Sequence, residues 1–309
     1  MTAERLERDE RRIRVLWNPS SGRKGGIPTN RASRETILEL MARHGLGDEL
    51  YETGSEDEAT ELARDAVGQG YDVVVAAGGD GSIGLLGRQL LGTRTALGIL
   101  PLGSVMNIPR MIGLPRDLEE AAQVLRAGHL RQIDVGQVGD SIFFEAGSVG
   151  MFAAVSAEAT KADEGHYGAI LRTILAAVRY RPSRMTLELD EGKTIETRAL
   201  LVAVANGPFM GAGFTVAPEA SLEDGQFDIR IFLHYSKREL VLHFASIAFG
   251  RRAYEPRVRT ERAARVRITG RRPLPARADS EDIGTTPVAF EIRPQALRVV
   301  APRSSAAAG

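Results

Sequence analysis

The feature that most constrains the fold is the stretch 71–110, in which a strand, a glycine turn and a helix start occur twice. The apolar run Val73–Ala77 has the length and β-branched content of a buried parallel strand, and the turn 78–82, Gly-Gly-Asp-Gly-Ser, follows it directly. A second strand, expected over Ala96–Leu100, ends in the turn 101–104, Pro-Leu-Gly-Ser. Because open α/β sheets bind ligands at the carboxyl ends of their strands, we expect both turns at one such edge.

The turn 78–82 has the composition of a phosphate-binding loop. Its three glycines lack the Cβ atoms that would block a ligand, and backbone N–H groups can turn toward phosphate oxygens at a helix N-terminus. Asp80 lies in the middle, where a carboxylate beside a phosphate is repulsive unless it holds Mg²⁺ or removes a proton. Glycine turns also connect strands to helices in any α/β domain, but the second turn one β-α unit later favours a nucleotide phosphate site.

The first part of the chain alternates strands with helices. The pattern predicts strands at 13–17 and 50–53 and helices at 31–44, 55–67 and 118–127. Ser55 and Glu58 form a capping box at the start of one helix. This alternation predicts a parallel sheet that is covered by helices on both faces.

A second glycine-rich loop, 18–26, follows the first predicted strand. It carries hydroxyl groups together with Arg23 and Lys24. These groups suit a polyphosphate, and they equally suit a mobile surface loop with solvated cations.

The pattern becomes β-rich after Gly128. Strands joined by a tight turn are expected at 133–136 and 141–145, followed by a glycine turn at 147–150 and a helical region through Tyr180. Further strands, mostly antiparallel, are expected at 184–189, 194–205, 214–216, 226–232, 258–269 and 288–292, and an amphipathic helix at 236–249.

The change of pattern sets the predicted domain boundary at Asp134. The prediction is an α/β domain over 1–134, a β-rich domain over 135–302 and a disordered tail over 303–309.

The composition excludes several kinds of site. With no cysteine among 309 residues, disulfides, zinc–thiolate sites and thiol catalysis are excluded, and the five histidines lack metal-ligand spacing. Lysine plus arginine and aspartate plus glutamate both number 40, so nucleic acid is not indicated as a main partner. No signal-peptide core is present, and no apolar run approaches the ~18 residues of a membrane span, so any membrane contact is expected to be peripheral.

Motifs along nearly the whole chain resemble, in order and spacing, those of a known family. They are Asn18-Pro19-x-Ser21-Gly22, Gly78-Gly79-Asp80-Gly81-Ser82, Leu97–Ser104 with Asn107 and Arg110, Ile133-Asp134-Val135-Gly136, Asn206-Gly207, Pro218, Leu222-Glu223-Asp224-Gly225, and Ile292-x-Pro294-x-Ala296-Leu297-x-Val299. By these motifs the chain resembles the bacterial lipid kinases with a diacylglycerol kinase catalytic domain, which are relatives of sphingosine kinases and, more distantly, of NAD and phosphofructo kinases. The resemblance implies an N-terminal three-layer α/β nucleotide-binding domain, a C-terminal β sandwich, and ATP in the cleft between them.

The resemblance also implies roles for particular residues, with ATP and Mg²⁺ as cofactors and a lipid hydroxyl attacking the γ-phosphate. Asp80 matches the essential aspartate, Asp134 an aspartate near the cleft, and Glu281 the proposed base. Lys161 matches a charged residue of the same network, and Asp224 matches a ligand of a structural Mg²⁺ in some members. The nucleotide site would comprise Asn18, Ser21, Gly22, Arg23, Gly78, Gly79, Gly81, Ser82, Gly103, Ser104 and Asn107.

The chain departs from the family pattern at four places. Gly84-Leu85 replaces an Asn-Glu pair after the first turn, and Asn107 replaces a carboxylate after the second. Phe152-Ala153 replaces an Asp-Ala step. Ser280 replaces the glycine of the Asp-Gly-Glu base motif, which adds a Cβ where we expect unusual dihedral angles. These departures affect the expected acceptor and rate more than the fold.

Several segments keep two interpretations. Asp224 also suits an aspartate that caps its Glu-Asp-Gly turn, and 279–282 also suits a solvated acidic loop. The helix 236–249, with Arg251 and Arg252 beyond it, either rests on an anionic membrane or, as is more common, packs on its own sheet.

The sequence therefore favours an ATP- and Mg²⁺-dependent lipid kinase that phosphorylates a hydroxyl of diacylglycerol or a related lipid. It is expected in the cytoplasm, with peripheral contact at the inner face of the membrane, where its lipid substrate lies; no nucleic-acid partner is expected, and a homodimer stays open. Two alternatives remain: a kinase for a soluble acceptor such as NAD, which the β-rich second half disfavours, and a non-catalytic nucleotide- or lipid-binding member of the family.

Overall fold

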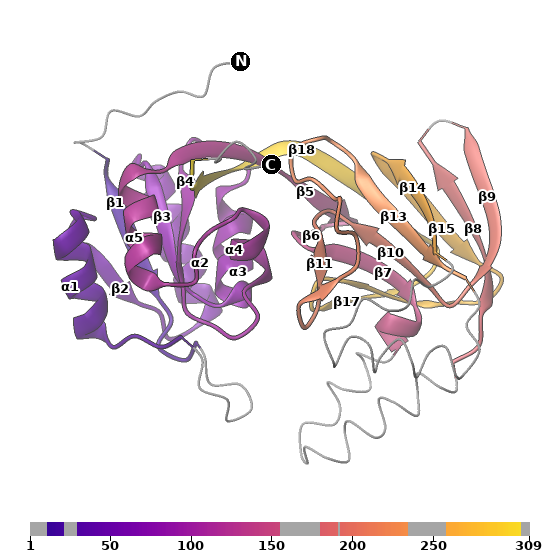
Figure 1. Cartoon of the computed structure of the whole chain (residues 1–309), viewed down its shortest axis with the longest axis horizontal. Coiled ribbons are helices and arrows are strands. Elements are labelled where there is room, and N and C mark those ends of the chain that lie inside the picture. Colours follow the sequence, from indigo (N-terminus) through magenta and orange to yellow (C-terminus); the bar gives the residue numbers. More distant parts are fainter. Residues whose placement is uncertain (1–10, 22–29, 155–179, 191, 234–257, 304–309) are drawn as a thin grey trace, which may run out of the picture. The chain divides into compact units, whose positions relative to one another are not determined.

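The structure of the chain is a computed structural model (Figure 1). It describes residues 11–21, 30–154, 180–190, 192–233 and 258–303.

The chain divides into two compact units. Unit 1 comprises residues 1–135 and 294–309, and unit 2 comprises residues 136–293. The strands β5 (His129–Val138) and β18 (Val288–Ala301) each run through a boundary, so the chain leaves unit 1 once and returns to it once. The sequence had placed 294–302 in the second domain. These residues belong to unit 1 because the end of β18 pairs with a strand of that unit.

Unit 1 is a parallel α/β fold, as predicted. Its elements are β1 (Ile13–Trp17), α1 (Arg34–His44), β2 (Leu50–Glu52), α2 (Glu56–Gly68), β3 (Val73–Gly78), α3 (Asp80–Leu90), β4 (Ala96–Pro101), α4 (Asn107–Met111) and α5 (Leu118–Ala127). The strand order is β2-β1-β3-β4, all parallel, and β18 adds a parallel strand beside β4 at Val299 and Leu97. The helix α1 contacts α5 and α2 contacts α3, which gives the two helix groups that a doubly covered sheet needs.

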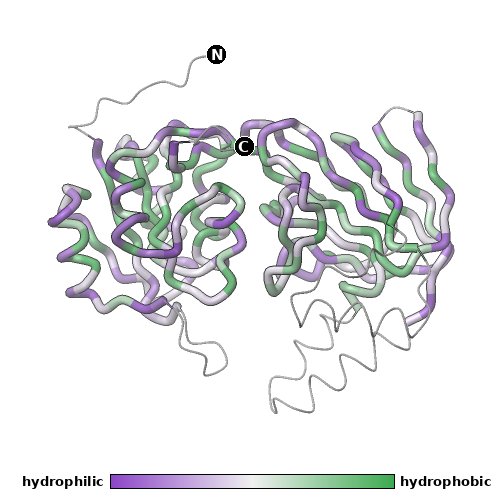
Figure 2. Tube along the Cα trace, in the orientation of Figure 1, coloured by the Kyte–Doolittle hydropathy of each residue, from purple (hydrophilic) through white to green (hydrophobic). Residues whose placement is uncertain are grey.

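The burial of the strands explains why the sequence predicted them well. Every residue of β1, β3 and β4 is buried, as expected for parallel strands that are covered on both faces. Figure 2 shows hydrophobic stretches along these strands. The helix α2 begins as predicted, since Ser55 Oγ accepts a hydrogen bond from the Glu58 N–H at 3.2 Å. The helix α1 begins at Arg34 rather than Arg31 because Ser33 caps it.

Unit 2 is built from two antiparallel sheets. The first has the order β14-β13-β10-β7-β16-β17. The second contains β9, β8, β15 and β18 in that order, with β5 paired to β18 and β6 paired to β5. The bounds of these strands are β6 (Ser141–Phe143), β7 (Ala146–Gly150), β8 (Ser183–Leu189), β9 (Lys193–Ala199), β10 (Leu201–Ala205), β13 (Phe227–Phe232), β14 (Val258–Ala263), β15 (Arg265–Gly270), β16 (Pro275–Ala278) and β17 (Glu281–Thr285). A small hairpin, β11 (Phe209–Met210) and β12 (Phe214–Thr215), stands apart from both sheets.

One hydrophobic core joins the two sheets of unit 2. It contains Val149 and Ile229 from one sheet, and Leu187 and Val266 from the other. The ring of Phe143 stacks on Phe227 at 5.7 Å and meets Phe290 edge-on at 5.9 Å. Two sheets that share one core in this way form a β sandwich, so the predicted fold class is confirmed.

Two predicted strands are each split in the structure. The stretch 194–205 breaks at Leu200 into β9 and β10, and the stretch 258–269 breaks at Ala264 into β14 and β15. In both cases the two halves belong to different sheets. Asp190 stabilises the break between β14 and β15, because its Oδ1 accepts the N–H groups of Ala264 at 3.0 Å and Arg265 at 2.9 Å.

The predicted glycine turn at 147–150 is wrong, because these residues form the buried strand β7. A Cβ atom on Gly147 would lie 2.8 Å from Cδ1 of Phe290 in the facing sheet. Glycine at this position makes room for an aromatic ring and does not mark a turn.

Candidate active site

The two glycine turns of unit 1 lie side by side at the carboxyl edge of its sheet, as predicted. The N–H of Leu102 donates to the Gly78 carbonyl oxygen at 3.0 Å. A Cβ atom on Gly103 would lie 3.0 Å from Cα of Gly79, which is tighter than most Cβ contacts and would push the two turns apart. Glycine at position 103 therefore lets the two turns approach closely.

The loop after β1 joins the same edge. The side-chain amide of Asn18 donates to Ser82 Oγ at 3.1 Å. A Cβ atom on Gly78 would lie 2.6 Å from the Ser82 Cβ and 3.3 Å from the Ser21 Oγ. The structure thus brings together the predicted residues of three separate segments.

The first turn of α3 faces this edge. Its N-cap residue, Gly79, provides no side chain to cap the helix, and a Cβ atom on Gly81 would have no atom within 4 Å. Backbone N–H groups at an uncapped helix N-terminus bind anions, because they carry the positive end of the helix dipole. The geometry therefore fits the phosphate groups of a nucleotide.

Asp80 is held at this position by the second turn. Its two carboxylate oxygens accept the N–H groups of Asn107 at 3.1 Å and of Ile108 at 3.0 Å. Burial raises the pKa of Asp80 above its ordinary value, whereas these hydrogen bonds and the nearby charge of Arg110 lower it. The carboxylate is therefore fixed in place, and its charge is costly to maintain.

The departure at Asn107 has a structural consequence. Asn107 is fully buried, and its backbone N–H contacts Asp80. The preceding residue, Met106, adopts a left-handed conformation with φ of 59° and directs the chain into α4. The contact that this segment makes to Asp80 through its backbone is independent of the side chain at position 107.

Two residues of this edge were missed by the sequence analysis. Arg116 donates to the Ser104 carbonyl oxygen at 3.0 Å and so places a cation beside the second glycine turn. Asn30 donates to the carbonyl oxygens of Pro101 at 3.1 Å and Arg116 at 2.6 Å. No motif identifies either residue, because both side chains bind backbone carbonyl oxygens, and every residue type carries such an oxygen.

In unit 2, the predicted base motif lies on the hairpin of β16 and β17. The carboxylate of Asp279 accepts three backbone N–H groups, those of Phe144, Glu145 and Ala146, at 2.8 to 3.1 Å. Asp279 is therefore a structural anchor, and the interpretation of 279–282 as a merely solvated loop is wrong for this residue. Glu281 is the first residue of β17, and its role as a base stays a prediction.

Ser280 does not carry the strain that the sequence suggested. The left-handed residue of this hairpin is Asp279, with φ of 47°. The loss of glycine at Ser280 therefore has no conformational cost of this kind.

Asp134 lies inside unit 1. It is fully buried, and its Oδ1 accepts the N–H of Gln295 at 2.7 Å. Gln295 has a φ of 49°, so the carboxylate fixes an unusual backbone position where β18 enters unit 1. This contact gives Asp134 a structural task, and its catalytic role stays a prediction.

Asp224 caps its own turn, as one interpretation of the sequence held. Its Oδ1 accepts the N–H of Gln226 at 3.1 Å, and its Oδ2 forms an ion pair with Arg262. Burial raises the pKa of neighbouring Asp228, which lies 3.7 Å from the Arg262 Nε. The described residues contain no group of three acidic or histidine side chains that could hold a metal ion, and the metal role of Asp224 stays a prediction.

A buried acid of unit 2 was also missed. Glu145 is 7% exposed, and its Oε2 accepts the N–H of Gly211 at 3.1 Å. Its carbonyl oxygen accepts the N–H groups of Asn206 and Gly207, which the family motif had included. A single glutamate between apolar residues gives little signal in the sequence.

Other predictions lie outside the described residues. They concern Gly22, Arg23, Lys161, the helix 236–249, and Arg251 with Arg252. Within the described part of the chain, no helix is both long and apolar enough to cross a membrane.

Together the two units define a class of protein, in which a parallel α/β unit with paired glycine turns is joined to an antiparallel β sandwich. Residues 12–138 match the diacylglycerol kinase catalytic domain, and residues 147–301 match the YegS C-terminal NAD kinase beta sandwich-like domain. The chain belongs to the diacylglycerol kinase family, and the resemblance inferred from the motifs is confirmed.

Curated relatives extend over the whole chain. A diacylglycerol kinase of Bacillus subtilis (strain 168) is 26% identical over 302 residues, which cover 96% of this chain and 98% of the relative. A diacylglycerol kinase of Staphylococcus aureus (strain MRSA252) is 26% identical over 297 residues, which cover 94% and 93%.

Solved structures show the same fold. A diacylglycerol kinase of Bacillus anthracis str. Sterne has a TM-score of 0.72 at 17% identity, covering 95% of this chain and 97% of that one. An NAD kinase of Archaeoglobus fulgidus in complex with ATP has a TM-score of 0.50 at 13% identity, covering 94% of each chain.

Proposed function

We propose that this protein is an ATP-dependent lipid kinase that transfers the γ-phosphate to a hydroxyl of diacylglycerol or a related lipid. The observation that carries the proposal is the position of Asp80, fixed between two glycine turns at a helix N-terminus in a chain of the diacylglycerol kinase family. An acid placed among phosphate-binding groups needs a chemical reason. The ATP complex of the NAD kinase with the same fold supports ATP as the donor.

The residues of the edge suit the needs of phosphoryl transfer, which are mainly positioning and charge neutralisation. The first-turn N–H groups of α3 would bind phosphate oxygens. The hydrogen bond between Asn18 and Ser82 holds the first loop against this turn, and Arg116 adds a positive charge beside the second turn.

The same residues fit a bound Mg²⁺. Mg²⁺ is commonly held by one or two carboxylates together with substrate phosphates, and Asp80 is a carboxylate whose orientation is already fixed by two N–H groups. When bound, the ion neutralises charge on the phosphates, and Asp80 is the residue that would hold it.

The proposal assigns Glu281 the role of the base that accepts the proton of the lipid hydroxyl. Glu281 follows the anchored residue Asp279 by two positions, so the backbone on which it stands is well fixed. The acceptor would be reached at a membrane surface, with the protein bound peripherally at its inner face.

The test is transfer of labelled γ-phosphate from ATP with Mg²⁺ into total bacterial lipids. We expect the wild type to produce a labelled lipid and Asp80→Asn and Glu281→Gln to lose at least about 100-fold of the rate, as for essential acid–base groups. Asp72→Asn is the matched control, because Asp72 precedes β3 at its other end and, within the described part of the chain, its carboxylate accepts a hydrogen bond only from the Arg12 N–H. Chromatography of the product then identifies the lipid.

The alternatives give different results in the same assay. A protein that binds ATP and labels no lipid, but labels NAD, is a kinase for a soluble acceptor. A protein that binds ATP and labels neither is a non-catalytic member of the family. Equal rates for the wild type and Asp80→Asn would contradict the role of Asp80 directly.

A further inference from the structure

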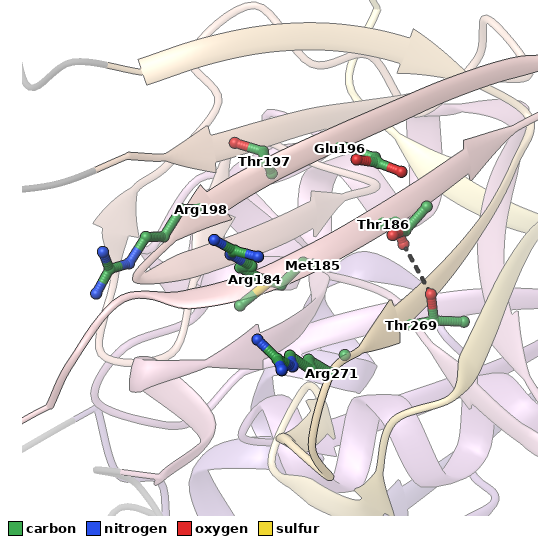
Figure 3. Close-up of a pocket in the computed structure, with 9 residues that line it drawn as sticks. Arg184, Met185, Thr186, Glu196, Thr197, Arg198, Thr269 and Arg271 are labelled. Atoms are coloured by element: carbon green, nitrogen blue, oxygen red, sulfur yellow. Dashed lines mark hydrogen bonds between the residues drawn. The ribbon is translucent and has the colours of Figure 1, made fainter.

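A polar hollow of about 530 Å³ lies on unit 2, on strands β9, β8 and β15 (Figure 3). Arg184 and Thr186 alternate along β8 with Met185 and Leu187, which are buried in the core of the sandwich. The hollow is therefore formed mainly by the solvent-facing side of the sheet. None of the residues proposed for the kinase reaction lines it.

Three arginines gather in this hollow. Arg184 lies directly opposite Arg198 on the neighbouring strand, and the Arg271 N–H donates to the Arg184 carbonyl oxygen at 3.3 Å. Like charges directly opposite each other on adjacent strands are destabilising. The sheet thus maintains an unfavourable concentration of positive charge, which a bound anion would relieve.

These arginines differ from others on the same sheet. Arg265, further along β15, forms an ion pair with Glu291 at 2.8 Å. Within the described part of the chain, Arg184 and Arg271 form no ion pair, and the Arg198 side chain donates only from its Nε, to the Pro182 carbonyl oxygen at 3.3 Å. The guanidinium groups therefore retain donors for a ligand.

The remaining lining supports an anionic ligand. Glu196 is the acid among the lining residues, and Figure 3 shows it beside Thr186, away from the three arginine side chains. The three arginines and one glutamate leave a net charge of +2 (3 − 1). Thr186 and Thr269 add hydroxyl groups, of which Thr269 Oγ1 donates to the Thr186 carbonyl oxygen at 3.4 Å. The volume lies within the roughly 300–1,000 Å³ of ligand pockets.

We propose that this arginine hollow, defined by Arg184, Arg198 and Arg271, binds the terminal phosphate of a phosphate monoester. A guanidinium group pairs with phosphate through two parallel hydrogen bonds, and a phosphate monoester offers three terminal oxygens and more negative charge to an arginine cluster than a carboxylate does. The phosphate can belong to a soluble ester or to a lipid headgroup. The proposal does not depend on the kinase reaction.

The first experiment measures the binding of inorganic phosphate by calorimetry at constant ionic strength, with the wild type and Arg184→Gln/Arg271→Gln. We expect the double variant to bind phosphate at least about tenfold more weakly, because charge-assisted hydrogen bonds are lost. Arg267→Gln is the matched control, since Arg267 lies on the solvent-facing side of β15 but does not line the hollow. Phosphate bound at the glycine turns contributes equally to all three proteins and cancels in the comparison.

The melting temperature without phosphate shows whether the variant is folded. The double variant should melt no lower than the wild type, because removing charges from Arg184 and Arg271 relieves repulsion. Equal phosphate affinity for the wild type and a folded double variant overturns the proposal, as does the absence of phosphate binding by the wild type.

Vesicles distinguish the two sources of the phosphate. Phosphatidylcholine vesicles with and without phosphatidate are sedimented with the three proteins. Stronger binding of the wild type and the control than of the double variant, only when phosphatidate is present, assigns the site to a lipid headgroup. If the proteins differ only with free phosphate, the site takes a soluble ester.

Discussion

Asp80 combines a fixed position with an ionisation that the surrounding structure disfavours. Its oxygens are held by two backbone N–H groups, while burial raises its pKa. Acids with a perturbed pKa cluster at functional sites, because the same burial that makes a charge costly also strengthens its effect on a ligand. The fixed aspartate therefore has the properties of a reactive group more than those of a turn cap.

The raised pKa predicts how a kinase reaction at Asp80 responds to pH. If the carboxylate form is required, activity falls on acidification at a pH above the ordinary pKa of aspartate, which is about 3.9. Arg110→Gln should move this acid limb to still higher pH, because the charge of Arg110 lowers the pKa of Asp80. The measurement is kcat/KM against pH for both proteins.

Arg94→Gln is the control for this profile, since Arg94 is exposed and precedes β4 at the end away from the glycine turns. It should leave the acid limb unchanged. An acid limb that stays in place in Arg110→Gln would assign it to a group other than Asp80.

At the scale of elements, Gly147 illustrates how the packing of two sheets limits the size of the side chain at one position. The Phe290 ring occupies the space that a Cβ atom on Gly147 would need, with Cδ1 at 2.8 Å. We predict that Gly147→Ala lowers the free energy of unfolding by about 1–3 kcal/mol, the usual cost of overpacking. Urea unfolding followed by circular dichroism measures it.

Phe290→Leu provides the test of this mechanism. Because the smaller side chain frees space beside Gly147, the double variant should lose less stability than the sum of the two single variants. Gly68→Ala is a matched glycine control at the end of α2, where a Cβ atom meets nothing within 4 Å, and it should change stability by no more than about 1 kcal/mol. Strict additivity of Gly147→Ala and Phe290→Leu would rule out the clash.

The sequence predicted well those elements whose structure is determined by residues within the element itself. The strand β3 is a continuous apolar run, β1 is apolar except for Arg14, and α2 has its capping box at its start. Unit 1 and its glycine turns could therefore be predicted, including their meeting at one edge.

The missed features depend on residues far apart in the sequence. The break at Leu200 follows from membership of two sheets, and nothing in the apolar run around it marks the change. Gly147 looks like part of a turn until Phe290 is placed opposite it. Asp279 looks like an exposed acid until the N–H groups of 144–146, which are more than a hundred residues earlier, are brought to it.

At the scale of the whole molecule, residues 294–301 of β18 belong to the same unit as residues 1–135. The last part of β18 pairs with β4, the Gln295 N–H donates to buried Asp134, and the Gly92 N–H donates to the Ala296 carbonyl oxygen at 2.9 Å. Its apolar side chains, Leu297, Val299, Val300 and Ala301, are fully buried. The sheet and the hydrophobic core of unit 1 therefore include residues 297–301 of β18.

This arrangement predicts that truncation after Arg293 destabilises unit 1 selectively. Burial of a Val or Leu side chain stabilises by about 1.5–3 kcal/mol, so the loss of several is comparable to the whole stability of a domain, about 5–15 kcal/mol. We expect amide hydrogens of β3 and β4 to lose protection from exchange. Those of β10 and β13 should keep it, because their partners lie within 136–293.

Hydrogen exchange measured by mass spectrometry distinguishes the two units in one experiment. Truncation after Arg303 is the control, since it leaves the described contacts of β18 in place. If β10 and β13 lose protection together with β3 and β4, the two units unfold as one cooperative body, and the division of the chain at Val135 and Arg293 has no thermodynamic counterpart. If β3 and β4 keep their protection, the terminal strand contributes packing that unit 1 does not require.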